Sequence, residues 1–291
     1  MTGLLSSMLS SIEVGLIFSI LAMGYMLTYK YLKYYDLSLE GTYPLGAFLA
    51  AVLIQQGLNP YLGIVGSIIC GGLAGLLTYF FYKKIKVDPL LSGILTLTML
   101  YSINLKIGGA SNIPLAGKAD IFFNLPKWAF LLIIAILVKI AIDYYLKSEI
   151  GYLLKITGNN RKLVKQLGKN PDTYIMLGLV LSNALIALSG GLMANYQGFA
   201  DIQMGTAMIV TGLASIIIGD TIMKSSDKLK DTSRAILGAL VYRLISGLAI
   251  YLGLNPNDLK LVTALIVIGF IAYNNYLGSR NYKRMVKNVG N

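Results

Sequence analysis

Histidine is absent from this sequence, cysteine occurs once, and charged residues are scarce. Of the 291 residues only 13% are charged, about half of the ~25% typical of a soluble domain. The lack of histidine excludes a histidine general base and a histidine-ligated metal. The single cysteine, Cys70, lies in the apolar run GSIICGGLAG, and one cysteine makes neither a disulfide framework nor a zinc site. We therefore expect no metal site and no catalytic residues in this chain.

The sequence also lacks the glycine-rich phosphate-binding loop G-x-x-x-x-G-K-[ST]. Its two Gly-Lys pairs, Gly117–Lys118 and Gly168–Lys169, have neither the spaced glycine nor the following Ser or Thr. Any hydrolysis of ATP must therefore take place on another chain, and that chain would bind the ATP and Mg²⁺.

Long apolar runs make up most of the chain, which is 56% apolar with a mean hydropathy of +0.67. A run of roughly 20 such residues crosses the ~30 Å hydrocarbon layer of a membrane. The sequence predicts an all-α, polytopic transmembrane bundle that forms a single domain over residues 1–291. We expect about nine spans, within a range of eight to ten, near residues 10–29, 42–56, 60–82, 89–106, 127–146, 174–197, 204–219, 234–252 and 259–277. The second span is short, and the segment before it could be a re-entrant half-helix.

Lysine and arginine are distributed unevenly between the two sets of loops. One set carries 19 of the 25 basic residues, whereas Lys106, Lys118, Lys127 and Lys260 lie on the other side. Because basic loops stay in the cytoplasm, the first set is expected inside, which puts the N-terminus outside and the C-terminus inside. The excess charge of +12 is thus accounted for without nucleic acid. The predicted inner segments are 30–41, 83–88, 147–173, 220–234 and 278–291.

The inner loop 147–173 is long, and its sequence predicts two short helices. The first ends near Gly158, and Asn159 or Asn160 caps the second. The second carries an apolar stripe on a basic helix, ends at Gly168, and is followed by an Asn170–Pro171 start for the next span. The stripe suits either docking on a protein or contact with the lipid surface. It consists of Leu163, Val164 and Leu167.

Within this loop, the pattern Gly151-x5-Thr157-Gly158-x-Asn160-x6-Leu167-Gly168-x-Asn170 resembles the cytoplasmic coupling loop of ABC importer permeases. The segments DLSLEGTYPLGAFLAA (36–51) and GLASIIIGDTI (212–222) are similar to those of the branched-chain amino acid and ribose permease superfamily. The run LLSGILTLTMLYSINLKIGGASNIPL (90–115) resembles a subgroup found beside binding proteins for tryptophan or tyrosine. One departure is Gly219, which is followed by Asp220 where the superfamily usually has a glycine-rich turn.

The resemblance implies a permease subunit in the cytoplasmic membrane of a bacterium. Two permease chains, expected to be a homodimer, would form the pathway at their shared axis. Two ATPase subunits would receive the coupling loop, and an extracytoplasmic binding protein would deliver a small solute. The subgroup implies an aromatic amino acid, although another small hydrophobic or nucleoside-like ligand stays open. The coupling residues it implies are Gly151, Thr157, Gly158, Asn160, Leu163, Leu167, Gly168 and Asn170.

Polar residues inside the spans are candidates for the translocation pathway, because ionisable groups in hydrocarbon are costly. Asn183 and Asn104 suit either the pathway or hydrogen bonds between helices. Arg243 lies mid-span and could contact a substrate carboxylate or be neutralised by a partner such as Glu13. The candidates are Ser92, Thr96, Asn104, Asn183 and Arg243. An ion-coupled secondary transporter is the alternative function, but it would need a mid-span carboxylate or broken helices, and we find no convincing carboxylate there.

Overall fold

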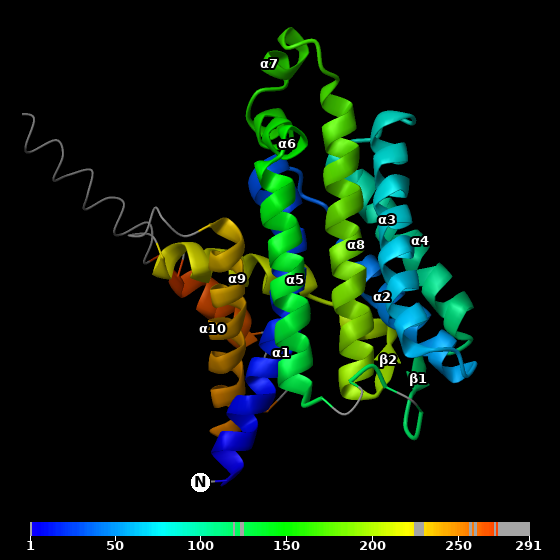
Figure 1. Cartoon of the computed structure of the whole chain (residues 1–291), viewed down its shortest axis with the longest axis vertical. Helices are drawn as coiled ribbons and strands as arrows, with labels where there is room; N and C mark the ends of the chain where they lie inside the picture. The colour runs from blue at the N-terminus through cyan, green and yellow to red at the C-terminus, as the bar shows by residue number, and fades with distance from the viewer. Residues whose placement is uncertain are drawn as a thin grey trace, which may run out of the picture.

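The computed structural model describes residues 2–118, 120–122, 125–223, 230–255, 258, 261–270 and 272. Most of these residues are helical, and the long helices lie side by side (Figure 1). In chain order the elements are α1 (Thr2–Met26), the π-helical turn η1 (Leu27–Leu32), α2 (Leu39–Gln55), α3 (Pro60–Lys83), α4 (Pro89–Gly108), β1 (Asn112–Pro114), α5 (Lys127–Lys147), α6 (Glu149–Asn159), α7 (Arg161–Gln166), α8 (Pro171–Gln197), β2 (Phe199–Asp201), the 3-10 turn η2 (Ile202–Gly205), α9 (Met208–Ile222) and α10 (Asp231–Tyr251).

Seven helices within the described residues are long and apolar enough to span a membrane, compared with the nine spans expected. The expected span 42–56 corresponds to α2, whose 17 residues extend about 25 Å and so fall short of the hydrocarbon thickness. The non-helical stretch before α2 includes the fully buried Asp36 and Ser38. Such backbone is tolerated at membrane depth only where protein surrounds it. Of the expected span 259–277, a helix over 261–270 is described.

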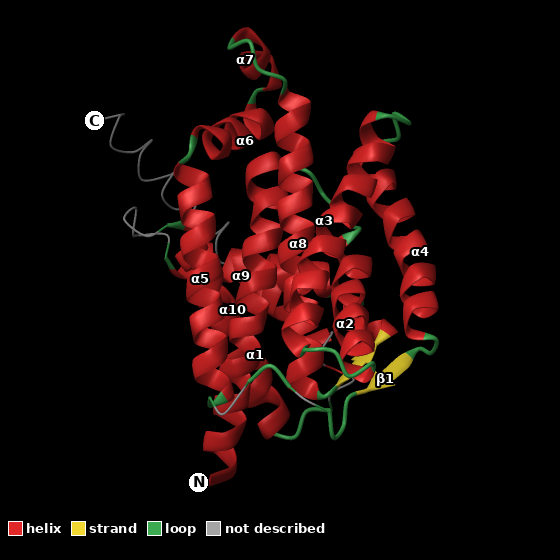
Figure 2. Cartoon of the chain, turned by 45° about the vertical axis from the view of Figure 1, so that its right-hand side comes forward, coloured by secondary structure: helices red, strands yellow, loops and turns green. Residues whose placement is uncertain are grey.

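The bundle has two distinct ends (Figure 2). α6 and α7 form one end, which we call the α7 end. At the opposite end, β1 and β2 pair antiparallel with Ile113 opposite Ala200, and we call this the ribbon end. The N-terminus lies at the ribbon end. The short ribbon is the one departure from the all-helical expectation among the described residues.

Close packing in the bundle depends on small residues along α3, α8 and α2. A side chain at Gly71 or Gly75 of α3 would overlap the backbone of α8, and one at Gly46 of α2 would overlap Ala187. α8 therefore lies in the interior, packed on α1, α2 and α3. This agrees with helix association in membranes, where small residues let backbones approach.

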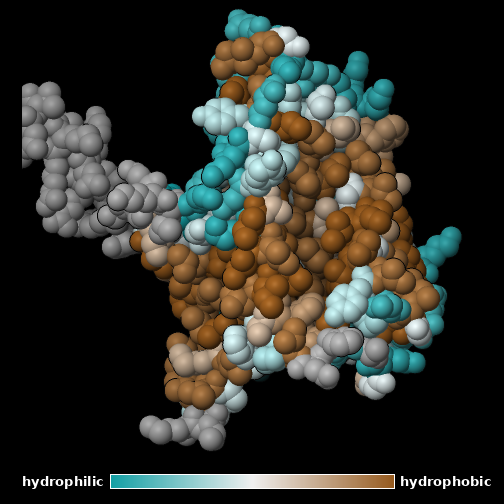
Figure 3. All heavy atoms as spheres, in the orientation of Figure 1, coloured by the Kyte–Doolittle hydropathy of each residue, from teal (hydrophilic) through white to brown (hydrophobic). Residues whose placement is uncertain are grey.

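On the face drawn in Figure 3 a broad apolar region crosses the middle of the molecule, and hydrophilic and apolar atoms are mixed at the α7 end. Exposed side chains such as Leu73 on α3, Met99 on α4 and Ile140 on α5 contribute to the apolar surface. Soluble proteins rarely expose contiguous apolar surface on this scale, so this region is the surface that meets lipid or neighbouring membrane proteins.

Candidate functional site

The α6–α7 elbow is built by side-chain caps that the sequence predicts. Asn160 Oδ1 accepts a hydrogen bond from the Leu163 amide at 3.1 Å and starts α7. Asn170 Oδ1 accepts one from the Asp172 amide at 3.0 Å and starts α8, with Pro171 in the first helical position. These caps satisfy amides that have no partner inside the helix. The two-helix interpretation of the loop is confirmed, with α6 extending one residue beyond Gly158.

Three of the predicted coupling residues lie against the bundle, so they are not on a docking surface. A side chain at Gly151 would overlap the backbone of Tyr145, and one at Gly158 would overlap the backbone of Tyr31. Thr157 is buried, and its hydroxyl donates to the Leu153 carbonyl at 2.7 Å. These residues therefore seat α6 tightly on the ends of α5 and η1.

The apolar stripe of α7 is divided between the two sides of the helix. Val164 is fully buried in a cluster with Leu154 and Ile175. The prediction that it belongs to an outward-facing stripe is therefore wrong. Leu163 and Leu167 are 40% and 54% exposed, respectively. The outward apolar surface of the elbow thus consists of Leu163 and Leu167, and Gly168 follows in the left-handed conformation with φ of +71°.

α6 adds exposed apolar side chains that the sequence analysis missed. The side chains of Ile150 and Tyr152 are 45% and 64% exposed. Leu153 and Leu154, on the side of α6 that faces the bundle, are buried. A cavity of about 460 Å³ opens beside Tyr152 and Leu167. The alternation of inward and outward residues along α6 was a signal that could have found them.

Ion pairs join the α7 end into one unit. Lys83 of α3 pairs with Asp172 of α8 at 2.5 Å. Arg161 of α7 donates to the Tyr82 hydroxyl at 2.7 Å, and Lys169 pairs with Glu149 of α6 at 3.0 Å. The elbow is consequently tied to both α3 and α8.

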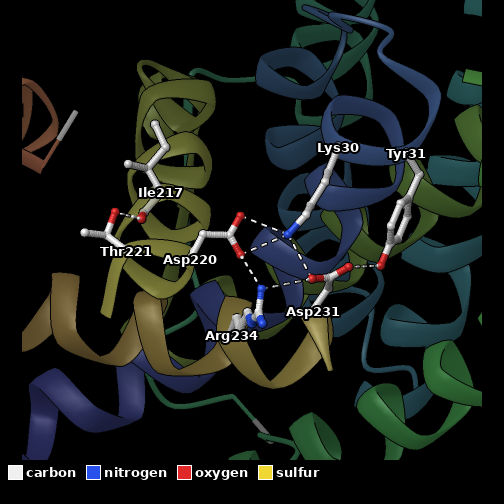
Figure 4. A network of polar contacts seen from close by, with 7 residues as sticks. All are labelled: Lys30, Tyr31, Ile217, Asp220, Thr221, Asp231 and Arg234. Carbon is white, nitrogen blue, oxygen red and sulfur yellow. Dashed lines mark hydrogen bonds and ion pairs between the residues drawn. The ribbon is translucent and has the colours of Figure 1, made fainter. Parts of the chain in front are cut away.

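A second ionic cluster links η1 with the facing ends of α9 and α10 (Figure 4). The Lys30 ammonium lies 2.9 Å from Asp220 and 2.8 Å from Asp231. Tyr31 donates to Asp231 at 2.6 Å, and Arg234 lies 3.7 Å from Asp220. Residues nearly 200 positions apart are thus held together.

Asp143 on α5 is the centre of a neighbouring cluster. Its Oδ2 accepts from Lys139, one turn earlier, and from Lys230, each at 2.8 Å. Its Oδ1 accepts from the Thr232 hydroxyl at 2.5 Å. The i,i+4 spacing of Lys139 and Asp143 is a signal in the sequence from which this pair could be predicted.

Asn183 of α8 joins the loop before α2 in a buried polar network. Its amide nitrogen donates to Asp36 Oδ2 at 2.9 Å, and its oxygen accepts from the hydroxyls of Thr42 at 2.7 Å and Ser38 at 3.2 Å. Asp36 Oδ1 also accepts from the Ser38 amide at 2.9 Å. These contacts fix the loop against α8.

The pathway candidates on α4 face the protein interior. Ser92, Thr96 and Asn104 are all fully buried. Thr96 accepts from the Thr78 hydroxyl of α3 at 3.0 Å, and Asn104 donates to the Gly41 carbonyl of α2 at 3.0 Å. Within this single chain their contacts hold α4 against α2 and α3, and their assignment to the pathway stays a prediction.

Arg243 on α10 does not pair with Glu13. Glu13 instead accepts from the Tyr196 hydroxyl at 2.9 Å. The guanidinium lies 3.6 Å from the centre of the Phe18 ring, and its Nε has neither solvent contact nor a hydrogen-bond partner among the described residues. The pairing was wrong because Glu13 and the arginine-facing residue Gly15 lie on different sides of α1. The described contacts of Arg243 are with Phe18 and Tyr242, and they include no contact with Asn183.

Comparison with known proteins identifies the family. Residues 7–272 match the family model described as branched-chain amino acid transport system / permease component. The tyrosine transport system permease protein of Clostridioides difficile is 43% identical over 94% of this chain and 92% of its own length.

Two solved structures share the fold at 16% identity. PsaBC from Streptococcus pneumoniae in complex with Fab covers 92% of this chain and 88% of its own, with a TM-score of 0.51. An inward-facing structure described as a metal-chelate type ABC transporter covers 94% and 85%, with a TM-score of 0.53. The chain belongs to the family of branched-chain amino acid transport system permease components and is a multi-pass permease subunit of the ABC type.

Proposed function

We propose that this chain forms the translocation pathway of a bacterial ABC importer for an aromatic amino acid. The observation that carries the proposal is the α6–α7 elbow, which presents exposed apolar side chains at one end of a membrane bundle. The tyrosine transport permease of Clostridioides difficile, at 43% identity, supports the choice of substrate. Two copies of the chain would enclose the pathway.

The α7 end is assigned to the cytoplasm, where two ATPase subunits would bind ATP and Mg²⁺. Basic residues concentrate there, among them Lys83, Lys155, Lys162 and Lys165, as expected for cytoplasmic segments. The ribbon end would then face outward and receive an extracytoplasmic binding protein. This orientation places the N-terminus outside and assigns the membrane as the bacterial cytoplasmic membrane.

Motion of the ATPase would reach the spans through the elbow. Leu163 and Leu167 would insert into an apolar pocket on the ATPase, alongside Tyr152 of α6. Because Gly151 and Gly158 bring α6 into backbone contact with the ends of α5 and η1, a push on the elbow would move these helices directly. Asn160 and Asn170 would keep α7 in place by capping its start and that of α8.

A paired charge substitution in the elbow tests this role. Leu163→Asp combined with Leu167→Asp should release the ATPase during purification in mild detergent, because two carboxylates would have to enter an apolar pocket. Both side chains are exposed, so the thermal stability of the permease itself should be unchanged. The matched control is Leu252→Asp. Leu252 directly follows Tyr251, the last residue of α10, and its side chain is 80% exposed, so this variant should retain the ATPase. Fully coupled transport by the double variant would refute the assignment.

Uptake by the reconstituted complex tests the substrate and the energy source. Proteoliposomes that contain the permease, its ATPase and its binding protein should accumulate labelled L-tyrosine only when ATP is supplied on the α7 side. Uptake that follows an ion gradient without ATP would instead favour a secondary transporter.

A further inference from the structure

A cavity of about 360 Å³ lies between α1 and α10, towards the ribbon end. The two helices run antiparallel, since Gly15 packs beside Arg243 and Gly247 packs beside Ser11. Four serines line the cavity together with Arg243, and they are Ser7, Ser10, Ser11 and Ser246. Its volume lies at the lower end of the range for small-molecule sites.

Arg243 supplies a positive charge to this cavity without an opposing charge. The Phe18 ring packs against the guanidinium at 3.6 Å, and no ion pair to Arg243 is found among the described residues. The acidic residue of α1, Glu13, is engaged by Tyr196. A guanidinium presents five N–H donors and no acceptor, so the complementary ligand group is a carboxylate or another anion.

The serines offer the opposite hydrogen-bonding character. Ser11 donates to the Ser7 carbonyl at 2.8 Å, Ser246 to the Tyr242 carbonyl at 3.0 Å, and Ser10 to the Ser6 carbonyl at 3.0 Å. Because the hydroxyl protons of these three serines are used within their own helices, the oxygen lone pairs remain to accept. The cavity therefore places acceptors beside a cationic donor, which matches an ammonium group next to a carboxylate.

We propose that this cavity binds the zwitterionic head of an α-amino acid, with Arg243 holding the carboxylate and the serine oxygens accepting from the ammonium group. The inference rests on the proposed function and names a site for its substrate. Val14 and Ile250 give the amino acid side chain an apolar wall.

The depth of the site favours an amino acid over a lipid headgroup. Arg243 lies eight residues before Tyr251, where α10 ends, which corresponds to about 12 Å along the axis. A lipid phosphate resides at the membrane boundary and would have to sink by that distance to contact the guanidinium. A small zwitterion has no such restriction.

Equilibrium binding to the purified full-length permease in nanodiscs tests the site. L-tyrosine should bind, whereas tyramine, which lacks the carboxylate, and 3-(4-hydroxyphenyl)propionate, which lacks the ammonium group, should each bind at least about 10-fold more weakly. Arg243→Gln should raise the Kd for L-tyrosine by about 10- to 100-fold, the range expected from losing a charge-assisted hydrogen bond. Lys106→Gln, which removes a cation at the end of α4, should leave the Kd unchanged.

Several outcomes would overturn the inference. One is an unchanged Kd in folded Arg243→Gln, and another is equal binding of tyramine and tyrosine by the wild-type chain. If Arg243→Gln does not fold, Arg243→Lys and the ligand series on the wild-type protein decide the question. Loss of a co-purifying phospholipid from the variant, with tyrosine binding unaffected, would assign the cavity to lipid.

The proposed function is tested separately by uptake. If the wild-type complex imports tyrosine while Arg243→Gln still binds it normally, the site is wrong and the function stands. If the complex neither imports nor binds any of the 20 amino acids, both proposals fall.

Discussion

Replacing Asn183 by alanine should destabilise the bundle strongly, because this side chain connects α8 to the buried loop before α2. The substitution removes a hydrogen bond to the Asp36 carboxylate at 2.9 Å and those from the Thr42 hydroxyl at 2.7 Å and the Ser38 hydroxyl at 3.2 Å. A bond to a charged group contributes about 1.5–3 kcal/mol and a neutral one about 0.5–1.5 kcal/mol. The expected loss of unfolding free energy is therefore about 2.5–6 kcal/mol, which corresponds to a fall in Tm of about 5 to 25 °C.

The assay is thermal unfolding of the detergent-solubilised protein, with Asn195→Ala as the matched control. Asn195 lies on the same helix and is also buried, but its amide donates only to the Gly191 carbonyl of its own helix at 2.9 Å. Its loss should cost less than about 1.5 kcal/mol. If both variants lower the Tm equally, Asn183 does not connect the two segments as described, and the reasoning from the network fails.

Three further predictions concern orientation, the ionic cluster and helix packing. In a chain without its native cysteine, Leu252→Cys should react with a membrane-impermeant maleimide in intact cells, and Tyr152→Cys should react only after permeabilisation. The reverse result would show that the proposed orientation in the membrane is wrong. Lys30→Met leaves Asp220 and Asp231 with the longer contacts to Arg234 and should lower the Tm; an unchanged Tm would contradict the ion-pair account. Gly238→Ala should lower the free energy of unfolding by about 1–3 kcal/mol, because the added Cβ would overlap the Ser215 carbonyl of α9. The control is Gly3→Ala, whose added Cβ meets nothing within 4 Å.

Local features of the elbow were predictable because they depend on neighbours in the sequence. Asn160 and Asn170 each accept from an amide two or three residues later, and such caps are determined by the chain segment itself. The same holds for the all-helical membrane class, which follows from composition. The prediction failed for Val164, because its burial depends on a cluster formed with α6 and α8.

Long-range pairing of charges could not be predicted from the spans alone. Glu13 and Arg243 are both near the middle or outer part of their helices, but the rotation of α1 directs Glu13 to Tyr196. Lys30 and Asp231 meet because the π-helical turn after α1 reaches the start of α10. Helix rotation and register are set by packing, and a hydropathy pattern that is apolar on all sides does not specify them. The short length of α2 was predictable, because it follows from a short apolar run, but the burial of the loop before it depends on other helices.

The pairing of α1 with α10 has a consequence for how the chain is made. α1 ends at Met26, whereas its partner α10 ends at Tyr251, so α1 leaves the ribosome long before α10 is complete. At a synthesis rate of about 5–20 residues per second, some 10 to 45 s pass between completion of the two helices. During that interval the α1 face with Ser11 and Gly15, which α10 covers in the folded chain, must be covered by lipid or by another protein. Assembly of this helix pair therefore waits until α10 has been made.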